Sequence, residues 1–175
     1  MARRSLLRSL VPILLLAISA VAAACGGSDR ELTLEEYFLR FQELGNTADE
    51  RTAALADQLD LVPENQEERL ATFEVWFADS LDVQRDFLKD LDKVNPPVEV
   101  ESAHKELLIA RGALMDDFAD LFGDLESPSE LEEALLGQPE GDLIAAEDRN
   151  FEACNKLQTI ADDNGIDVRV LDYCG

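Results

Sequence analysis

Histidine is almost missing from this chain of 175 residues, and its scarcity excludes several kinds of metal centre. The one histidine, His104, cannot build a zinc or copper site that requires several imidazole ligands. It follows Glu101 at the spacing of the Glu-x-x-His metal motif of helical bundles, but that site needs a second such pair. We therefore expect no bound metal, and we predict that His104 is a surface or helix-start residue.

Sequence motifs of catalysis are missing too. The chain contains neither a Gly-x-Ser-x-Gly turn nor a glycine-rich phosphate loop. Residues 162–167 superficially resemble a calcium loop, but its first and twelfth positions would be Ile160 and Leu171, which are not ligands. Carboxylates are abundant, so residue type alone leaves a paired-carboxylate hydrolase open, yet nothing indicates the apolar cleft that raises a carboxyl pKa. We expect no catalytic residue, no cofactor and no enzymatic activity.

Basic side chains are scarce, and this excludes a nucleic-acid partner. The chain has 15 Lys and Arg against 38 Asp and Glu, which gives a formal net charge of −23. Such a charge repels nucleic acid and anionic lipid head groups alike. We interpret the acidic residues as a solvated surface that keeps the protein soluble, with specific cation binding as the alternative.

Long apolar runs are missing except at the amino terminus. Residues 10–24 form an uncharged, mostly apolar run of about fifteen residues, preceded by Arg3, Arg4 and Arg8. A membrane-spanning helix needs about 18 or more apolar residues, so the run is short for one. A positive segment followed by a run of this length predicts that residues 1–24 are an export signal peptide.

The end of this run, Ala22-Ala-Ala-Cys25, resembles the lipobox of bacterial lipoproteins. The resemblance implies that the Cys25 sulfur receives a diacylglycerol and that the chain is cut before this residue. The residue three positions before the cysteine departs from the lipobox pattern, because it is most often Leu and here it is Ala22. We expect a lipid-anchored, extracytoplasmic protein whose residues 25–31 form a flexible tether. The alternatives are ordinary secretory cleavage that leaves Cys25 a free thiol, and twin-arginine export, which residues 3–8 resemble.

Cysteine is rare, and only Cys154 and Cys174 accompany Cys25. In an exported protein an even pair predicts a disulfide. The alternatives are metal ligation, for which two isolated cysteines are too few, and a redox pair, which usually has closer spacing. Closing a loop of about twenty residues should add around 3 kcal/mol to stability.

Hydrophobic periodicity of three to four residues predicts helices almost everywhere after the tether. Thr33 and Glu36 form a capping box at the first of them, while Gly45 weakens its middle. We predict an all-α fold, a four-helix bundle with one short extra helix, in a single domain over residues 32–175. The predicted helices cover residues 34–60, 64–94, 99–124, 128–136 and 142–164. Residues 166–174 alternate apolar and polar side chains, which predicts an extended tail tied back by the Cys154–Cys174 disulfide.

Aromatic residues make up only 6% of the chain, but they concentrate in the first two predicted helices. Their helical spacing indicates core positions first. Trp76 and Tyr37 are the best candidates to line a groove or a partner surface.

Three segments together resemble a class of secreted α-helical lipoproteins of actinobacteria and related bacteria. They are 34–38 (LEEYF), 96–104 (PPVEVESAH) and the stretch from Cys154 through Gly165 to Cys174. The class carries no known activity, so it implies no functional residue. We expect a non-enzymatic binding or interaction module at the cell envelope, attached to the membrane by its lipid, with an envelope protein or a small ligand as partner. The alternatives are a spacer lipoprotein without a ligand and a metal-binding bundle.

Overall fold

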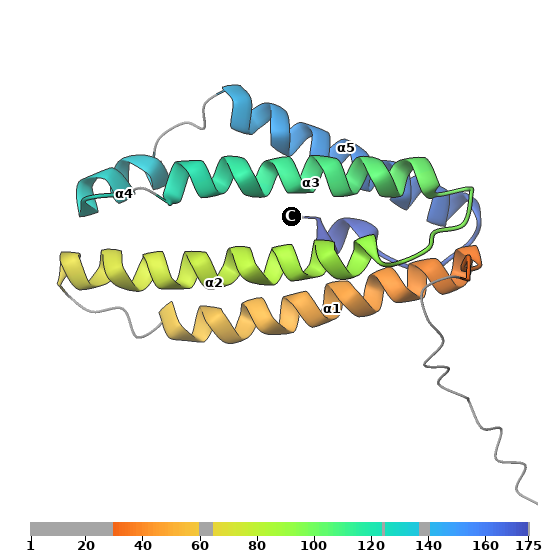
Figure 1. Cartoon of the computed structure of the whole chain (residues 1–175), viewed down its shortest axis with the longest axis horizontal. Helices are drawn as coiled ribbons and strands as arrows, with labels where there is room; N and C mark the ends of the chain where they lie inside the picture. The colour runs from red at the N-terminus through yellow and green to blue at the C-terminus, as the bar shows by residue number, and fades with distance from the viewer. Residues whose placement is uncertain (1–29, 60–64, 124, 137–140, 175) are drawn as a thin grey trace, which may run out of the picture.

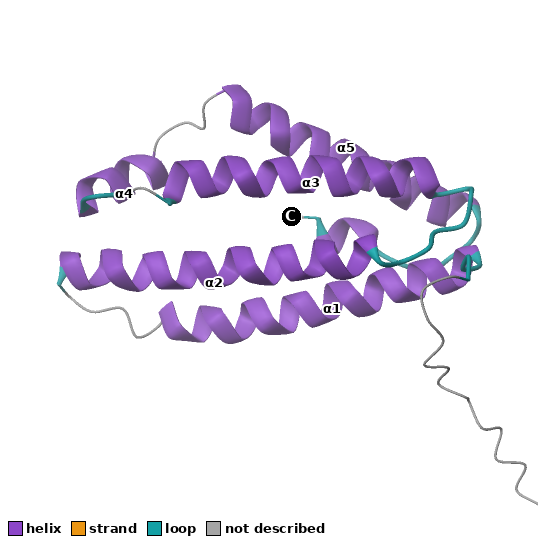
Figure 2. Cartoon of the chain, in the orientation of Figure 1, coloured by secondary structure: helices purple, strands orange, loops and turns teal. Residues whose placement is uncertain are grey.

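We describe the protein from a computed structural model, over residues 30–59, 65–123, 125–136 and 141–174. These residues are helical and contain no β-strand, so the all-α prediction is confirmed for them (Figure 2). The helix ends agree with the predicted ends to within two residues. In chain order the elements are α1 (Leu34–Leu59), α2 (Gln66–Asp92), α3 (Glu101–Phe122), α4 (Pro128–Leu136), α5 (Gly141–Asp163) and a final 3₁₀-helix, η1 (Val170–Tyr173).

Local capping explains where these helices begin. The Glu36 backbone N–H donates to Thr33 Oγ1 at 3.3 Å, and the Thr33 N–H donates to Glu36 Oε2 at 2.9 Å, which confirms the capping box of α1. The Glu130 N–H donates to Ser127 Oγ at 3.3 Å before α4. Gly165, with φ of 68°, follows α5 in the left-handed conformation that ends many helices.

Consecutive long helices run in alternating directions (Figure 1). Helix α1 packs on α2, α2 on α3, and α3 on α5, while α4 contacts α2 and α3. We call the end where the described chain begins at Arg30 the proximal end, on the right in Figure 1. The opposite end, with the start of α2, the end of α3 and α4, is the distal end.

The hydrophobic core is larger toward the proximal end than toward the distal end. The larger buried cluster joins α1, α2, α3, α5 and η1, and its fully buried large side chains include Tyr37, Phe38, Phe41, Leu91, Leu107 and Leu157. The smaller cluster contains only Leu81, Leu114, Met115 and Ala146, with partly exposed neighbours such as Phe77 and Phe118. Aromatic side chains at the distal end are therefore left partly open to solvent.

The C-terminal tail differs from its prediction, because its last part is a 3₁₀-helix and not an extended strand. Cys174 must approach Cys154, and the two Cα atoms lie 6.4 Å apart. The part of α5 beyond Cys154 rises only about 15 Å, whereas nine extended residues would span about 30 Å. The turn of η1 takes up this slack. The Gln158 side chain supports it, accepting from Val170 N at 2.7 Å and donating to Val168 O at 3.0 Å.

The side chain of Tyr173 in η1 explains why α1 contains a glycine in its middle. A Cβ atom built on Gly45 would lie 2.4 Å from Tyr173 Cδ1, so the ring needs the space that glycine leaves. The Tyr173 hydroxyl also donates to Asn46 Oδ1 at 2.8 Å. The residue that weakens α1 locally is therefore the one against which the C-terminal segment packs.

Candidate functional site

Five aromatic side chains gather at the distal end and form what we call the distal aromatic cluster. Phe73, Trp76 and Phe77 come from α2, and Phe118 and Phe122 come from α3. The Phe73 ring centre lies 5.8 Å from Trp76, 5.8 Å from Phe77 and 5.7 Å from Phe122. All five side chains are partly exposed. The rings thus pack on one another while keeping some of their apolar surface in contact with solvent.

Trp76 brings an unpaired polar atom into this cluster. Its Nε1 is buried and has no hydrogen-bond acceptor among the described residues. Buried tryptophan N–H groups usually find a partner, and an unpaired buried donor costs about 1–3 kcal/mol. Packing among the described residues therefore leaves the indole N–H unsatisfied.

Exposed apolar side chains surround the distal end. Val75 on α2 is 59% exposed, and Leu121 on α3 and Leu136 on α4 are also exposed. Each stands on an element that contributes to the distal end. Together with the distal aromatic cluster they give the distal end exposed apolar groups from three helices, as interaction surfaces have.

At the proximal end, Tyr37 and His104 form a buried pair. His104 stands in the first turn of α3, as the helix-start alternative predicts, but it is only 3% exposed, so the surface alternative is wrong. Tyr37 is 0% exposed, in the core position that its helical spacing indicates first, and it does not line a groove. The Tyr37 hydroxyl lies 3.1 Å from His104 Nδ1, and this hydrogen bond allows the core to accept an imidazole.

Burial governs the ionisation of this pair. Desolvation lowers the pKa of His104, and although the charge of Asp92 opposes this change, Lys105 adds to it. Desolvation also raises the pKa of Tyr37. Both side chains are therefore neutral at pH 7.

His104 lies on the wall of an open cleft of about 510 Å³ beside the turn between α2 and α3, which we call the proximal cleft. The turn contains Pro96 and Pro97, and the prolines end α2 as predicted. The polar residues that line the cleft are Glu31, Asp92, Asn95, Glu101, His104 and Lys105. Carboxylates thus dominate its charge.

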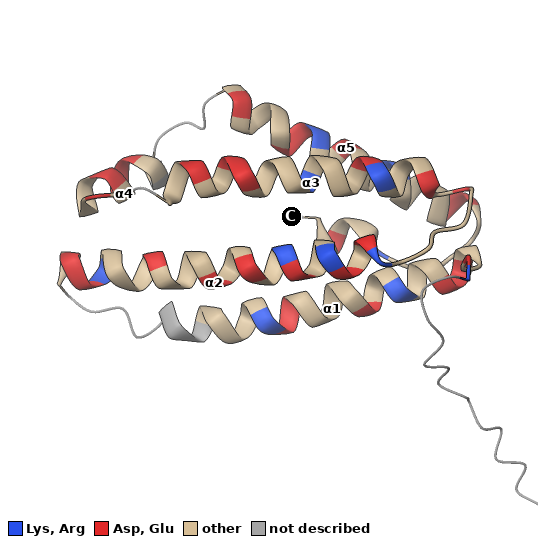
Figure 3. Cartoon of the chain, viewed as in Figure 1, with Lys and Arg blue, Asp and Glu red and all other residues tan. Residues whose placement is uncertain are grey.

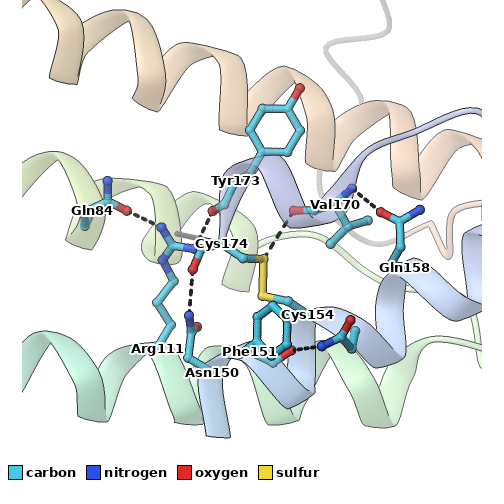
Figure 4. The surroundings of a disulfide bond; sticks show 10 residues. Gln84, Arg111, Asn150, Phe151, Cys154, Gln158, Val170, Tyr173 and Cys174 are labelled. Carbon is cyan, nitrogen blue, oxygen red and sulfur yellow. Dashed lines mark hydrogen bonds between the residues drawn. A yellow bond between two sulfur atoms is a disulfide. The ribbon is translucent and has the colours of Figure 1, made fainter. Parts of the chain in front are cut away.

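The predicted disulfide is present and holds η1 against α5 (Figure 4). Cys154 and Cys174 are both buried, with an S–S distance of 2.07 Å. The Asn150 side-chain amide donates to Cys174 O at 2.9 Å beside the disulfide. Figure 4 shows Arg111 and Asn150 reaching toward the last carbonyls of the tail. This arrangement is structural, since it satisfies backbone groups of the tail.

Arg111 is a buried cation that the sequence does not reveal. Its Nη1 donates to Tyr173 O at 2.5 Å and its Nη2 to Gln84 Oε1 at 2.7 Å, while Phe87 lies below the guanidinium, 5.2 Å from its carbon. Desolvation lowers the pKa of Arg111 to about 10, and Asp49 opposes this change, so the side chain stays charged at pH 7. In the sequence, only its position on the apolar stripe of α3, one residue after Ala110, indicated that this arginine would be buried.

The structure does not test the predictions made for the amino-terminal residues. Cys25, predicted to carry the lipid, and the segment 1–24 lie outside the described residues, as does most of the tether. No helix in the described ranges is long and apolar enough to cross a membrane. Among the same residues, no three or more His, Cys, Asp or Glu side chains are grouped so as to hold a metal ion.

Comparisons of this chain with protein-family models, with curated proteins and with solved structures give no match.

Proposed function

We propose that this protein is a lipid-anchored, extracytoplasmic four-helix bundle that binds a partner protein at the cell envelope and is not an enzyme. The observation that carries the proposal is the distal aromatic cluster, which is partly exposed and contains an unpaired indole N–H. Such amphipathic aromatic surface is typical of interaction sites. On this proposal the domain covers residues 32–175 and the lipid is attached to Cys25.

The geometry suits a protein that presents its binding surface away from a membrane. The described chain begins at the proximal end, shortly after Cys25. The distal aromatic cluster lies at the opposite end, and α1 alone is about 39 Å long. A lipid on Cys25 would hold the proximal end near the membrane surface and leave the distal end free to meet a partner.

The charge indicates what kind of partner would fit. Acidic residues stand along all the helices and outnumber the basic ones (Figure 3). A partner with an apolar contact surface surrounded by Lys and Arg would therefore be attracted, and an acidic protein would be repelled.

A crosslinking experiment in native membranes tests the proposal. A photoreactive amino acid replaces Val75, which is 59% exposed at the distal end, or Leu39, which is 58% exposed near the proximal start of α1 and serves as the matched control. We expect one discrete crosslinked protein from position 75 and none from position 39. In the position-75 chain, Trp76→Ala should abolish the product, whereas Phe151→Ala, an exposed aromatic side chain on α5, should not.

Two outcomes would contradict the proposal. Equal products from positions 75 and 39, or no product at either, would favour a spacer lipoprotein without a partner. The anchor is tested separately by labelling cells with a fatty-acid probe. We expect label on the wild-type chain and none on Cys25→Ala, and an unlabelled wild-type chain would reject the lipid.

A further inference from the structure

On the wall of the proximal cleft, His104 carries a ring nitrogen that has no hydrogen-bond partner among the described residues. His104 is 97% shielded from solvent, being 3% exposed, and it lines the cleft. Its Nδ1 faces Tyr37 in the core at 3.1 Å. Because Nδ1 is turned to the core and His104 lines the cleft, the opposite edge of the ring, which carries Nε2, is the edge left to face the cleft. Among the described residues only Nδ1 of this ring has a hydrogen-bond partner. A polar atom placed in this way is available to a ligand.

The hydrogen bond with Tyr37 decides which tautomer His104 adopts. Tyr37 is 0% exposed, and among the described residues His104 Nδ1 is the one hydrogen-bond partner of its hydroxyl. Because a buried hydroxyl needs an acceptor, Tyr37 donates and Nδ1 supplies the lone pair. A neutral imidazole with a lone pair on Nδ1 carries its proton on Nε2. His104 therefore presents an N–H donor, and no free lone pair, at the wall of the cleft.

The walls of the cleft select the charge of the ligand. Lys105 is engaged with Glu101 at 2.6 Å, and Glu31 accepts from Val98 N at 3.2 Å. Asp92 forms no ion pair with the described residues, so its carboxylate is open to a cation. A metal ion is disfavoured because Nε2 carries a proton, and a carboxylate ligand is repelled by the three acidic walls.

We propose that the proximal cleft binds a small organic amine that carries a neutral carbonyl oxygen, the chemistry of a peptide amino terminus. The ammonium group pairs with Asp92, and the carbonyl oxygen accepts a hydrogen bond from His104 Nε2. The cleft volume of about 510 Å³ lies within the range of about 300–1,000 Å³ usual for small-molecule sites. This site lies at the end opposite the distal aromatic cluster and does not depend on it.

The single histidine makes a direct test possible, because selective ¹⁵N-histidine labelling of the full chain reports on His104 alone. We expect a protonated Nε2 and an unprotonated Nδ1 in the free protein. Alanyl-alanine amide, which has an ammonium group and no carboxylate, should shift the Nε2 signal. Its N-acetylated form, which lacks the ammonium group, and butylamine, which lacks the carbonyl, should bind at least about tenfold more weakly.

Variants separate the two contacts. Asp92→Asn should weaken the binding of alanyl-alanine amide about tenfold, whereas Asp148→Asn, the same charge change at an exposed position on α5, should leave it unchanged. Tyr37→Phe removes the donor to Nδ1 and should populate both tautomers, a change that a purely structural role of Tyr37 would not produce. Circular dichroism checks that each variant remains folded.

The proposal is overturned by a proton on Nδ1 in the free protein, by equal binding of the peptide amide and its acetylated form, or by the absence of any shift with all probes. It is also overturned if Zn²⁺ alone displaces the Nε2 proton at a lower concentration than the peptide amide needs. Crosslinking from Val75 is unaffected by any of these results, so failure here is distinct from failure of the proposed envelope partner.

Discussion

Gly45 is the residue whose role depends most clearly on a distant contact. Because a Cβ atom there would meet the Tyr173 ring at 2.4 Å, Gly45→Ala should displace η1 or bend α1. We expect the free energy of unfolding to fall by about 1–3 kcal/mol, as for other overpacked sites. Urea denaturation followed by circular dichroism measures the change.

Gly112 in α3 is the matched control for this prediction. A Cβ atom there meets nothing within 4 Å, and the residue is helical. Gly112→Ala should therefore raise the free energy of unfolding by roughly 0.5–1 kcal/mol through helix propensity alone. A stabilised Gly45→Ala variant would show that the Tyr173 ring does not lie against α1.

His104 predicts a dependence of stability on pH. Since burial lowers its pKa in the folded protein, the unfolded chain binds more protons than the folded one below about pH 6.5. The free energy of unfolding should therefore decrease as the pH falls from 6.5 toward the folded pKa. His104→Gln keeps an acceptor for Tyr37 but does not titrate. We expect the stability difference, wild type minus variant, to decrease between pH 7.5 and 5.

Carboxylates titrate in both the wild type and the His104→Gln variant, so their contributions to the pH dependence cancel in this difference. What remains is the contribution of the imidazole. One of these carboxylates is Glu36. Its hydrogen bonds with Thr33 and Arg30 lower its pKa to about 2. A difference that stays constant with pH would show that the imidazole is not shielded from water.

Among the secondary-structure elements, η1 depends most on a covalent link. Only four residues long, it has little stability of its own, and the Cys154–Cys174 disulfide closes a loop with a sequence separation of 20. Replacing both cysteines by alanine should lower the free energy of unfolding by around 3 kcal/mol. Hydrogen exchange should quicken in residues 166–174 before it does in α3 or α5.

The disulfide variant has a clear contrary outcome. If exchange in residues 166–174 stays as slow as in the wild type, then the hydrogen bonds from Arg111, Asn150 and Gln158 suffice to hold η1. Adding Arg111→Met to the double cysteine-to-alanine variant should then speed hydrogen exchange in residues 166–174, which would show that these hydrogen bonds hold η1.

Across the entire protein, like charges repel one another. With a net charge of −23, raising NaCl from about 10 to about 150 mM should increase the melting temperature, because the Debye length shortens from about 30 to about 8 Å. Differential scanning calorimetry measures the shift. Surface ion pairs such as Arg51–Asp86 weaken in salt, but each contributes little.

A comparison of salts separates screening from binding. MgCl₂ at the same ionic strength as NaCl should produce the same shift if the acidic surface is merely solvated. A clearly larger shift with Mg²⁺ would support specific cation binding, the alternative interpretation of this surface.

Helix positions could be predicted from local chemistry, because a capping box at Thr33, a proline pair after α2 and a glycine after α5 each act within one turn of chain. The candidate sites could be predicted only in part. Trp76 is partly exposed, Tyr37 lies in the core that its helical spacing indicates first, and His104 stands in the first turn of α3, but the burial of His104 was not predicted. That burial involves a hydrogen bond with Tyr37 across 67 residues, which local sequence does not encode.

What followed from the order of residues alone was the helical class, the ends of the helices, the acidic surface and the pairing of the two C-terminal cysteines. These depend on nearest neighbours in the chain, on composition or on simple counting. Tertiary packing alone decided that Tyr37 would shield His104, that Gly45 would receive the Tyr173 ring and that Arg111 would be buried beneath the tail. The reason is physical: desolvation and close packing depend on which segments meet in space, and each of these meetings joins residues more than sixty positions apart.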